Sequence, residues 1–310
     1  MFPTMRESMF ALALPIPRLE RACALLLLLA SCRASDRSTP ALALEVPPDL
    51  AAAEAAWKAD PTDETNIVWY GRRTAYEGRF EDAVAIYGEG LRLHPDSVQL
   101  LRHRGHRWLS LRRFEDARTD LERAAALVVG TADEVELDGQ PNPFGIPRST
   151  LHTNVWYHLG LAYHLLEEDA RAAGAFARCL AAAPNDDMRV AAAYWRTIAL
   201  VHLGRIEDAR ALASLYAGRD LELMESQDYA ALLALFAGTS DAASERLGGA
   251  EGAVAHATQA YGVAMAHLAS GRTDAARQLL EALVAGPSSA AFGRLAAEVE
   301  LERLARAGTP

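Results

Sequence analysis

The sequence predicts an all-α protein built from repeated helix-turn-helix units, and three observations lead to this prediction. The segment RFEDA occurs at Arg79–Ala83 and again 34 residues later at Arg113–Ala117, and RIEDA follows at Arg205–Ala209. The apolar fraction is 51%, mostly alanine and leucine, and aromatic residues make up 7%, which favours helices over strands. Glycine and proline separate the apolar segments at regular intervals, where turns would lie.

Aligning the chain on these segments gives six units. They cover, in order, Glu64–Ser97, Val98–Thr131, Thr153–Asp186, Val190–Leu223, Met224–His256 and Ala257–Ala290. Two packed helices need a small residue where they touch. One such position holds alanine in every unit: Ala83, Ala117, Ala172, Ala209, Ala243 and Ala276. A second holds Gly71, Gly105 and Gly160, and the turns hold Gly78, Gly204, Gly238 and Gly271, where a positive φ costs little.

The RFEDA segment itself has a structural explanation. Phe80, Phe114 and Ile206 are the apolar residues at the start of each second helix. The Glu-Asp pair after each lies in the first helical turn, where negative charge meets the positive end of the helix dipole. These acids are therefore not candidates for paired-carboxylate catalysis.

The third unit resembles the tetratricopeptide repeat (TPR). It contains WYHLGLAYHLLEEDARAAGAFARCLAAAP, in which the consensus positions are Trp156, Leu159, Gly160, Tyr163, Ala172, Phe176 and Pro184. The resemblance extends over most of Glu64–Ala290 and implies a right-handed TPR superhelix, an α-solenoid of about six units. Residues 291–310 are expected to form a C-terminal capping helix and tail that cover the open end of the stack. A local irregularity is expected after Leu247.

The first 31 residues predict a signal peptide, because a short apolar run, Ala22–Ala30, follows Arg18 and Arg21. Leu29-Ala30-Ser31-Cys32 resembles the lipobox of bacterial lipoproteins, which implies that Cys32 carries the lipid. The residue after Cys32 is Arg33, not the aspartate that retains lipoproteins in the inner membrane. If the organism has two membranes, the resemblance therefore implies the outer membrane, facing the periplasm. An ordinary cleaved signal is the alternative. Residues 32–63 would be a tether.

Residues 132–152, ADEVELDGQPNPFGIPRSTLH, interrupt the repeats. The segment begins with Asp133, Glu134, Glu136 and Asp138 and continues with proline, glycine and asparagine. Long loops within compact repeats usually carry function or are disordered. The loop is therefore expected to be a lid over a ligand or a structural cover, and the sequence leaves both open.

The helix LRHRGHRW places arginines where the repeat normally has apolar or small residues. Arg104 and Arg107 lie in this helix, and Arg73 is the equivalent of Arg107 in the first unit. A buried arginine needs a carboxylate or carbonyl partner. Either these three form an internal ion-pair network with the acids of the insertion, which we favour, or they form a site for a peptide carboxylate.

The first helices of a TPR array line its groove. The ligand-facing positions predicted for this groove are Arg72, Tyr76, Arg102, His106, Asn154, Tyr157, His164, Tyr194 and His202. Arginine, tyrosine and asparagine supply anchors and directional hydrogen bonds for an extended peptide. The set does not reproduce the two-lysine, two-asparagine carboxylate clamp of chaperone-binding TPR domains. An ordinary solvated surface is the alternative.

No catalytic residues, metal site or cofactor are predicted. The chain lacks nucleophile-elbow, phosphate-loop, dinucleotide and zinc-protease motifs. His152, His158 and His164 are six residues apart, which does not place them on one helical face. Cys179 lies at a small-residue packing position and is expected to be buried and inert. A formal net charge of −10 argues against nucleic-acid binding.

The sequence therefore predicts a non-enzymatic adaptor of the bacterial envelope that holds a protein or peptide in its groove and is anchored through lipidated Cys32. One alternative is a constitutive subunit of an envelope assembly. Another is an enzyme that uses the insertion with His158 and Arg102. The ligand, the pathway and the oligomeric state do not follow from the sequence.

Overall fold

The computed structural model describes residues 49–241, 253–286 and 290–307. Contacts divide the chain into residues 1–43, which lie outside the described part, and residues 44–310, which contain all of the helices below. The predicted signal peptide, the lipobox with Cys32 and the irregularity after Leu247 fall outside the described residues. Among the helices that the structure describes, none is long and apolar enough to span a membrane.

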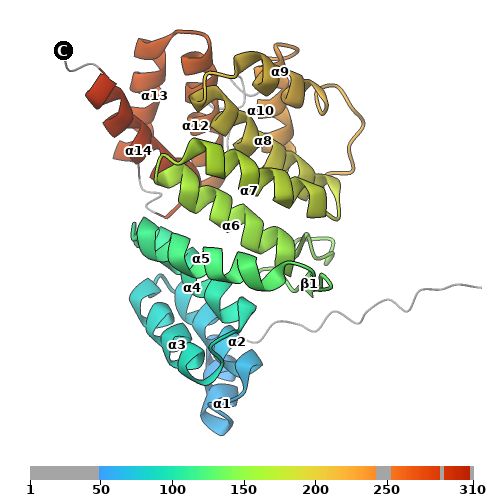
Figure 1. Cartoon of the computed structure of the whole chain (residues 1–310), viewed down its shortest axis with the longest axis vertical. Coiled ribbons are helices and arrows are strands. Elements are labelled where there is room, and N and C mark those ends of the chain that lie inside the picture. Colours follow the sequence, from blue (N-terminus) through green and yellow to red (C-terminus); the bar gives the residue numbers. More distant parts are fainter. Residues whose placement is uncertain (1–48, 242–252, 287–289, 308–310) are drawn as a thin grey trace, which may run out of the picture. The chain divides into compact units, whose positions relative to one another are not determined.

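The described residues form helix-turn-helix pairs that follow one another along the chain (Figure 1). After α1 (Leu50–Ala59), the first four pairs are α2 (Glu64–Tyr76) with α3 (Phe80–Leu93), α4 (Val98–Ser110) with α5 (Phe114–Val128), α6 (Leu151–Leu165) with α7 (Asp169–Ala182), and α8 (Asp186–His202) with α9 (Ile206–Ser214). They are followed by α10 (Gln227–Ala237), α12 (Ala253–Ala269), α13 (Thr273–Ala285) and α14 (Phe292–Ala307).

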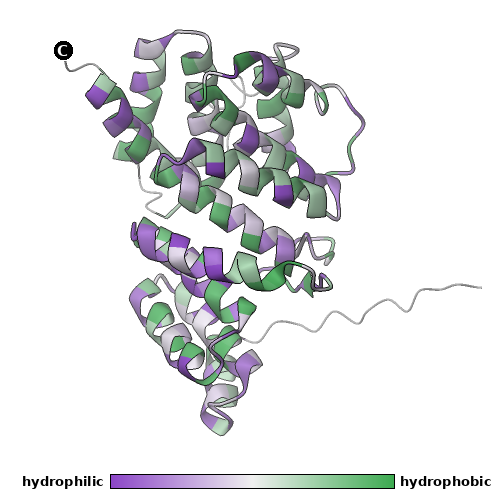
Figure 2. Ribbon diagram, in the orientation of Figure 1, coloured by the Kyte–Doolittle hydropathy of each residue, from purple (hydrophilic) through white to green (hydrophobic). Residues whose placement is uncertain are grey.

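Each helix packs mainly on its neighbours in sequence, from α1 against α2 through to α13 against α14. Figure 2 shows hydrophobic and hydrophilic residues on different sides of many of these helices. No single pair can bury its apolar side alone, so stacking of adjacent pairs creates the core. The predicted fold class, an all-α solenoid, is confirmed.

The small-residue positions are the contacts between the two helices of a pair. The five described alanines of the recurrent position are at most 2% exposed: Ala83, Ala117, Ala172, Ala209 and Ala276. A Cβ atom on Gly71, Gly105 or Gly160 would lie 2.3–2.6 Å from the side chain of Tyr87, Leu121 or Phe176, respectively. Glycine at these positions therefore allows the first helix to lie directly against the large residue of the second.

The segment expected to be a tether, residues 32–63, contains helix α1. Asp49 caps this helix by accepting a hydrogen bond from the Ala52 N–H at 2.7 Å. Ala53 is buried, and Trp57 stacks on Tyr70 of α2 with 5.0 Å between ring centroids. The stacked solenoid thus begins at α1, because this short helix covers the apolar side of α2.

The insertion folds into two short strands, β1 (Val135–Glu136) and β2 (Ser149–Thr150), which pair antiparallel. Thr150 and Thr153 form a reciprocal capping box at the start of α6. The helix therefore begins at Leu151, two residues before the expected start of the third unit. Within residues 132–152, the backbone carbonyl of Glu134 also accepts a hydrogen bond from Leu151 N at 2.9 Å.

The sequence suggested that α14 would cover the open end of the stack, but this helix also makes contacts with earlier helices. It packs on α12 and α13 and also contacts α6. Arg112, in the turn after α4, forms two 2.7 Å hydrogen bonds with Glu298, and Glu167, in the turn after α6, pairs with Arg306. These contacts join α14 to turns that lie much earlier in the chain, because acidic and basic residues of α14 match charges in those turns.

The two turns that α14 reaches differ from the others in one respect. Gly78, Gly204, Gly238 and Gly271 have φ near +70° in four of the turns between helices. Arg112 and Glu167, both with φ of 60°, adopt the left-handed conformation without being glycine. Such a residue costs roughly 1 kcal/mol or more relative to glycine. The ion pairs with α14 account for side chains at these two positions.

Candidate functional site

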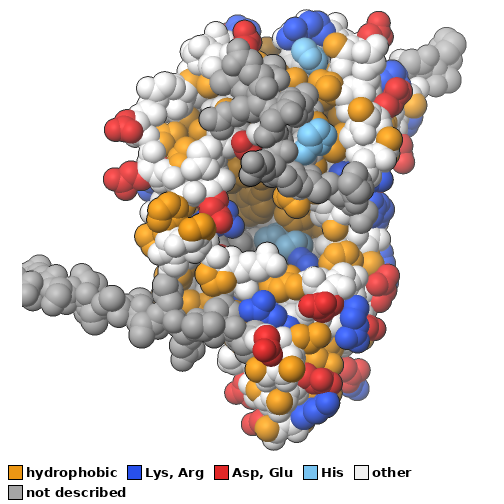
Figure 3. Space-filling view, turned by 180° about the vertical axis from the view of Figure 1, so that it is seen from behind, with side chains coloured by type: hydrophobic (Ala, Val, Ile, Leu, Met, Phe, Trp, Pro, Cys, Tyr) orange, Lys and Arg blue, Asp and Glu red, His pale blue; other side chains and the backbone are white. Residues whose placement is uncertain are grey.

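A cavity of about 250 Å³ lies where α2, α4 and α6 meet the insertion. Five of the nine residues predicted to face a ligand line it: Arg72, Tyr76, Arg102, His106 and Asn154. The face drawn in Figure 3 is hollowed near its middle, with histidine and with lysine or arginine side chains at the border of the hollow. The cavity has four arginines in its wall, Arg72, Arg102, Arg107 and Arg148, and two carboxylates, Glu136 and Asp138. It is therefore cationic in a chain whose net charge is negative.

Glu136 of β1 fixes the insertion over α4. Its Oε1 pairs with Arg102 and accepts from His103 Nε2 at 3.1 Å, and its Oε2 accepts from Asn154 Nδ2 at 2.9 Å. Burial by itself would raise the pKa of Glu136, but the Arg102 guanidinium and the hydrogen bond from His103 hold it well below its usual range. The carboxylate is therefore ionised, and it neutralises the charge of the Arg102 guanidinium.

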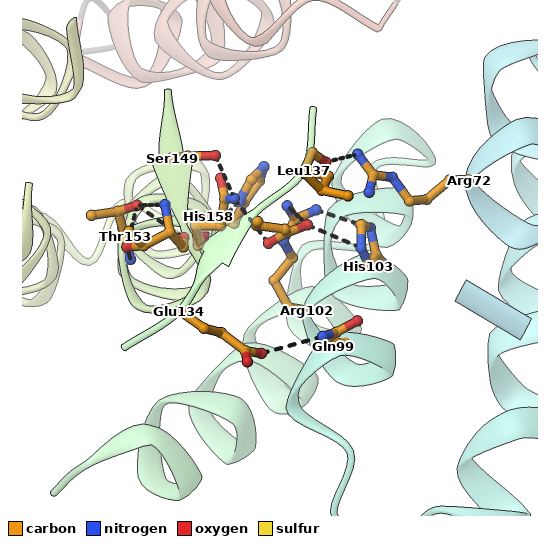
Figure 4. Close-up of polar contacts among 12 residues, drawn as sticks. Arg72, Gln99, Arg102, His103, Glu134, Leu137, Ser149, Thr153 and His158 are labelled. Carbon is orange, nitrogen blue, oxygen red and sulfur yellow. Dashed lines mark hydrogen bonds and ion pairs between the residues drawn. The ribbon is translucent and has the colours of Figure 1, made fainter. Parts of the chain in front are cut away.

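Arg72 and Tyr76 of α2 hold the next part of the insertion. The Nη2 atom of Arg72 donates to the carbonyl of Leu137 at 2.9 Å, and its guanidinium lies 4.4 Å from the centroid of Trp69. Tyr76 packs so closely on Gly139 that a Cβ atom there would lie 2.0 Å from the phenolic oxygen. Figure 4 shows Arg72, Arg102 and His103 pointing towards the insertion from two helices.

The three arginines expected to form ion pairs behave differently from one another. Arg104 forms two 2.7 Å hydrogen bonds with Asp120 of α5. Arg73 instead lies over Trp69 and Tyr76, with 5.6 and 5.4 Å from its guanidinium carbon to the ring centroids. Arg107 lies over Phe80 at 5.6 Å. Within residues 49–241, 253–286 and 290–307, neither Arg73 nor Arg107 has a carboxylate partner.

The ion pair with the insertion that was expected at Arg107 is formed by Arg102 instead. Arg102, predicted to face a ligand, is neutralised by Glu136, because the insertion contacts the first half of α4 and not its end. Arg107, predicted to be an internal ion pair, lines the cavity with its charge unmatched. Burial, together with the neighbouring Arg102 and Arg72 charges, lowers the pKa of Arg107 to about 10, although Tyr87 and Tyr76 oppose this shift.

The expected groove is corrected at four positions. Tyr194 is fully buried, His164 is 3% exposed, Tyr157 is 9% exposed, and the side chain of His202 is 6% exposed. Tyr157 accepts from Trp195 Nε1 at 2.8 Å and lies 3.2 Å from the Tyr229 hydroxyl. These residues are unavailable to a ligand because α10, α12 and α14 pack over them.

The cavity residues that the sequence did not single out as site residues include Glu136 and Arg148. The sequence marks Glu136 only as one of four acids at the start of the insertion, and it predicts no role for Arg148. Arg148 lines the cavity and pairs with Glu225 at 2.9 Å. No local pattern marks either residue, because their partners are 34 and 77 positions away in the sequence.

The histidines beside the cavity are neutral. Burial, and then the charge of Arg102, lower the pKa of His158 to about 3, although its Nδ1 lies 2.6 Å from the carbonyl of Asn154. Burial and Arg107 also lower the pKa of His106 well below its ordinary value. His106 packs on His158, with 4.3 Å between ring centroids, and on Phe292 of α14 at 5.3 Å. Neutral rings leave the positive charge of the cavity to the arginines.

Lowering the pH from about 6.5 to about 4.5 is expected to destabilise the folded protein through His158. Its folded-state pKa of about 3 lies below its ordinary value of 6.5, so the unfolded chain binds the additional proton in this window. Stability therefore rises with pH there, and the loss on acidification is on the order of 2 kcal/mol for this residue. Urea titrations of wild type, His158→Gln and the exposed control His256→Gln measure it. An undiminished pH dependence in His158→Gln would contradict the assignment.

The single described cysteine is not part of the site. Cys179 is fully buried, and burial raises the pKa of its thiol to about 12. Its Sγ lies 3.4 Å from the carbonyl of Thr153. The thiol is therefore protonated and inaccessible, as its packing position predicted.

The fold and the cavity define the chain as an α-solenoid with a cationic pocket beneath an inserted loop. No protein-family model matches the chain, and no curated protein matches its sequence.

Solved structures of TPR proteins resemble it weakly. YrrB, described as a TPR protein with an unusual peptide-binding site, has 14% identity and a TM-score of 0.44 over 80% of this chain and 97% of its own. A TPR protein from Parabacteroides merdae has 16% identity and a TM-score of 0.46 over 81% of this chain and 91% of its own. PilW, a type IV pilus biogenesis factor, has 16% identity and a TM-score of 0.45 over 76% of this chain and 83% of its own. The assignment of the fold rests on the helix contacts of this chain itself.

Proposed function

We propose that this protein is a non-enzymatic adaptor that binds a partner protein by holding a carboxylate group of that partner in the arginine-lined cavity. The observation that carries the proposal is Arg107, a half-buried cation in the cavity wall with no carboxylate partner among the described residues. Arg104, one helical turn away, shows the contrast, because Asp120 neutralises it completely.

The chemistry of the cavity selects an anion. Arg72 donates one hydrogen bond to a backbone carbonyl, and Arg107 lies over an aromatic ring. Neither partner is an anion, so both guanidinium groups keep their positive charge towards the cavity. Guanidinium groups bind carboxylates through charge-assisted, often paired hydrogen bonds. A carboxylate that enters would relieve the repulsion among Arg72, Arg102 and Arg107. The His106 and Asn154 side chains supply further polar contacts at the wall.

The size of the cavity and its position favour a group that belongs to a protein. About 250 Å³ accommodates an acidic side chain or a chain terminus, not a folded domain. Tyr76, which lines the cavity, is 40% exposed, and the insertion also exposes Phe144 and Ile146. Solenoids present extended surfaces of this kind for partner binding. In this arrangement the insertion is both a structural cover, through Glu136, and a contact surface.

The location of this adaptor is proposed from the sequence. The apolar run at residues 22–30 and the lipobox-like segment ending at Cys32 support export and lipid anchoring at a bacterial envelope membrane. The tether that remains between Cys32 and α1 would separate the solenoid from the membrane surface.

Replacing Arg107 by methionine is expected to weaken partner binding by roughly 10- to 100-fold, because one charge-assisted contact is worth about 1.5–3 kcal/mol. The folded protein itself is expected to be equally stable or more stable by up to about 2 kcal/mol, because a half-buried charge without a carboxylate partner is removed. Crosslinking and co-purification from native membranes, with Arg92→Met as a control on an exposed arginine, measure binding. Urea titration measures stability.

Identical partners in wild type and Arg107→Met would overturn the proposal. Competition separates the possible sources of the carboxylate: displacement of the partner by an acidic peptide but not by acetate or phosphate supports a protein ligand. Displacement by the small anions alone would mean that the cavity binds a small molecule. The membrane or soluble fraction that contains the protein tests the predicted anchor in the same preparation.

A further inference from the structure

A second group of polar side chains lies away from the cavity, where α14 crosses α6 and α8. His164 comes from α6, Asp169 is the first residue of α7, and His202 is the last residue of α8. One ligand atom from each, a ring nitrogen or a carboxylate oxygen, lies within 4.8 Å of the other two. Glu300 of α14 adds a fourth group, with its Oε2 3.3 Å from His202 Nε2.

The atoms that face one another are unsatisfied. His164 Nδ1, Asp169 Oδ1 and His202 Nε2 are all buried, and none makes a hydrogen bond to a residue that the structure describes. The 3.3 Å contact between His202 and Glu300 lacks hydrogen-bond geometry. A buried polar atom without a partner costs about 1–3 kcal/mol. Three such atoms around one point are satisfied together by a single cation.

The surrounding contacts orient these atoms as ligands. His164 Nε2 lies 2.8 Å from the Tyr261 hydroxyl, which fixes the ring and leaves Nδ1 directed towards Asp169. Arg303 Nη1 donates to Asp169 Oδ2 at 2.9 Å, which leaves Oδ1 directed towards the histidines. Outer contacts of this kind, which hold a histidine ring and a carboxylate in place, are typical of metal centres.

The spacing fits a tetrahedral ion. Ligand atoms about 2.1 Å from a tetrahedral Zn²⁺ lie about 3.4 Å from one another. His164 Nδ1 and Asp169 Oδ1 are 3.8 Å apart, and His202 Nε2 and Glu300 Oε2 are 3.3 Å apart. Small side-chain rotations bring both pairs to that spacing. Two imidazoles with two carboxylates favour Zn²⁺ or a similar transition metal over Mg²⁺ and Ca²⁺, which prefer oxygen ligands alone.

Acidic and basic side chains surround the four ligands. Glu167, Asp169 and Glu300 bring three carboxylates to this region, and Arg303 and Arg306 bring two guanidinium groups. Both histidine side chains are less than 10% exposed, which disfavours their charged forms. The site would therefore offer a Zn²⁺ ion two ring nitrogens and two carboxyl groups as ligands.

We propose that His164, Asp169, His202 and Glu300 form a structural site for one Zn²⁺ ion, which ties the C-terminal helix α14 to the middle of the solenoid. Histidine spacing along single helices predicted no metal site. The four ligands of this site come from α6, α7, α8 and α14, and span residues 164 to 300.

The test is a titration of the full chain, purified without a histidine tag and stripped with a chelator, with Zn²⁺ by calorimetry and with Co²⁺ as a spectroscopic probe. One equivalent of Zn²⁺ is expected to bind in the micromolar range or more tightly. The bound Co²⁺ should show the intense visible absorption of a tetrahedral complex. Zn²⁺ should also raise the melting temperature and slow hydrogen exchange in residues 292–307.

His202→Gln is expected to weaken Zn²⁺ binding by 100-fold or more, and the nearly isosteric Glu300→Gln by roughly tenfold. His256→Gln, an exposed histidine of α12, is the matched control and should bind as wild type does. Circular dichroism of the stripped variants shows that they are folded. Failure of the wild type to bind one equivalent, or binding that both ligand variants retain, would overturn the proposal. The carboxylate-binding experiment uses a different cavity, so either result stands without the other.

Discussion

Replacing Glu136 by alanine is expected to destabilise the protein by about 3–5 kcal/mol, because it leaves Arg102 as a buried charge without a partner. Arg102 and Glu136 are 6% and 8% exposed. The same substitution removes the acceptor of His103 and of Asn154, and these contacts, with the β1–β2 pairing, hold the insertion on α4 and α6. The insertion should therefore detach before the helices unfold.

The neighbouring residue Glu134 provides a matched control. It lies on the same loop and is exposed, and its side chain makes only a 3.3 Å hydrogen bond to Gln99 in the described structure. Glu134→Ala is expected to change stability by no more than about 0.5 kcal/mol. Denaturant titration gives both free energies, and hydrogen exchange follows residues 132–150. Equal effects of the two substitutions would show that the buried ion pair does not hold the insertion.

Stability is expected to fall on acidification through Glu136, as it does through His158. The origin differs, because Glu136 is charged in the folded protein whereas His158 is neutral. The pKa of Glu136 is lowered in the folded protein, so its contribution is present above the unfolded-state pKa of 4.5 and is lost as the pH falls below it. Acid should therefore weaken wild type more than Glu136→Ala in this range. This pH range lies below the range of about 6.5 to about 4.5 in which His158 lowers the stability.

Replacing Gly160 by alanine is expected to destabilise the protein by about 2–3 kcal/mol through overpacking. The new Cβ would lie 2.6 Å from the ring of Phe176, which is fully buried and cannot move aside. Gly160 lies in the middle of α6, where the loss of glycine by itself would favour the helix by roughly 0.5–1 kcal/mol. Packing is therefore expected to outweigh helix propensity.

Gly174→Ala separates these two effects. Gly174 also lies within a helix, α7, but its Cβ would meet no atom within 4 Å. This substitution is expected to stabilise the protein by about 0.5–1 kcal/mol. Thermal or urea unfolding of the two variants measures the difference. If Gly160→Ala were as stable as Gly174→Ala, the glycine positions shared by the first three pairs would not be contacts between helices.

The sequence alone determined the solenoid, because a repeated local pattern carries the information for it. Helices α2 and α4 begin 34 residues apart, and the alanines and glycines that recur at this spacing lie where the helices touch. Helix propensity, turn glycines and small contact residues act over a few turns of chain. They can therefore be read from neighbouring residues without knowledge of the partners.

Only the tertiary structure decided which polar residues are matched and which are open. Arg102 and Arg107 lie on the same helix, and the sequence could not show that β1 would neutralise the first and leave the second. Tyr194 and His164 occupy groove positions of their repeat, yet α14 returns over the solenoid and helps to bury this part of it. Charge pairing and burial depend on residues far apart in the chain, up to Arg112 with Glu298, and no local pattern encodes such contacts.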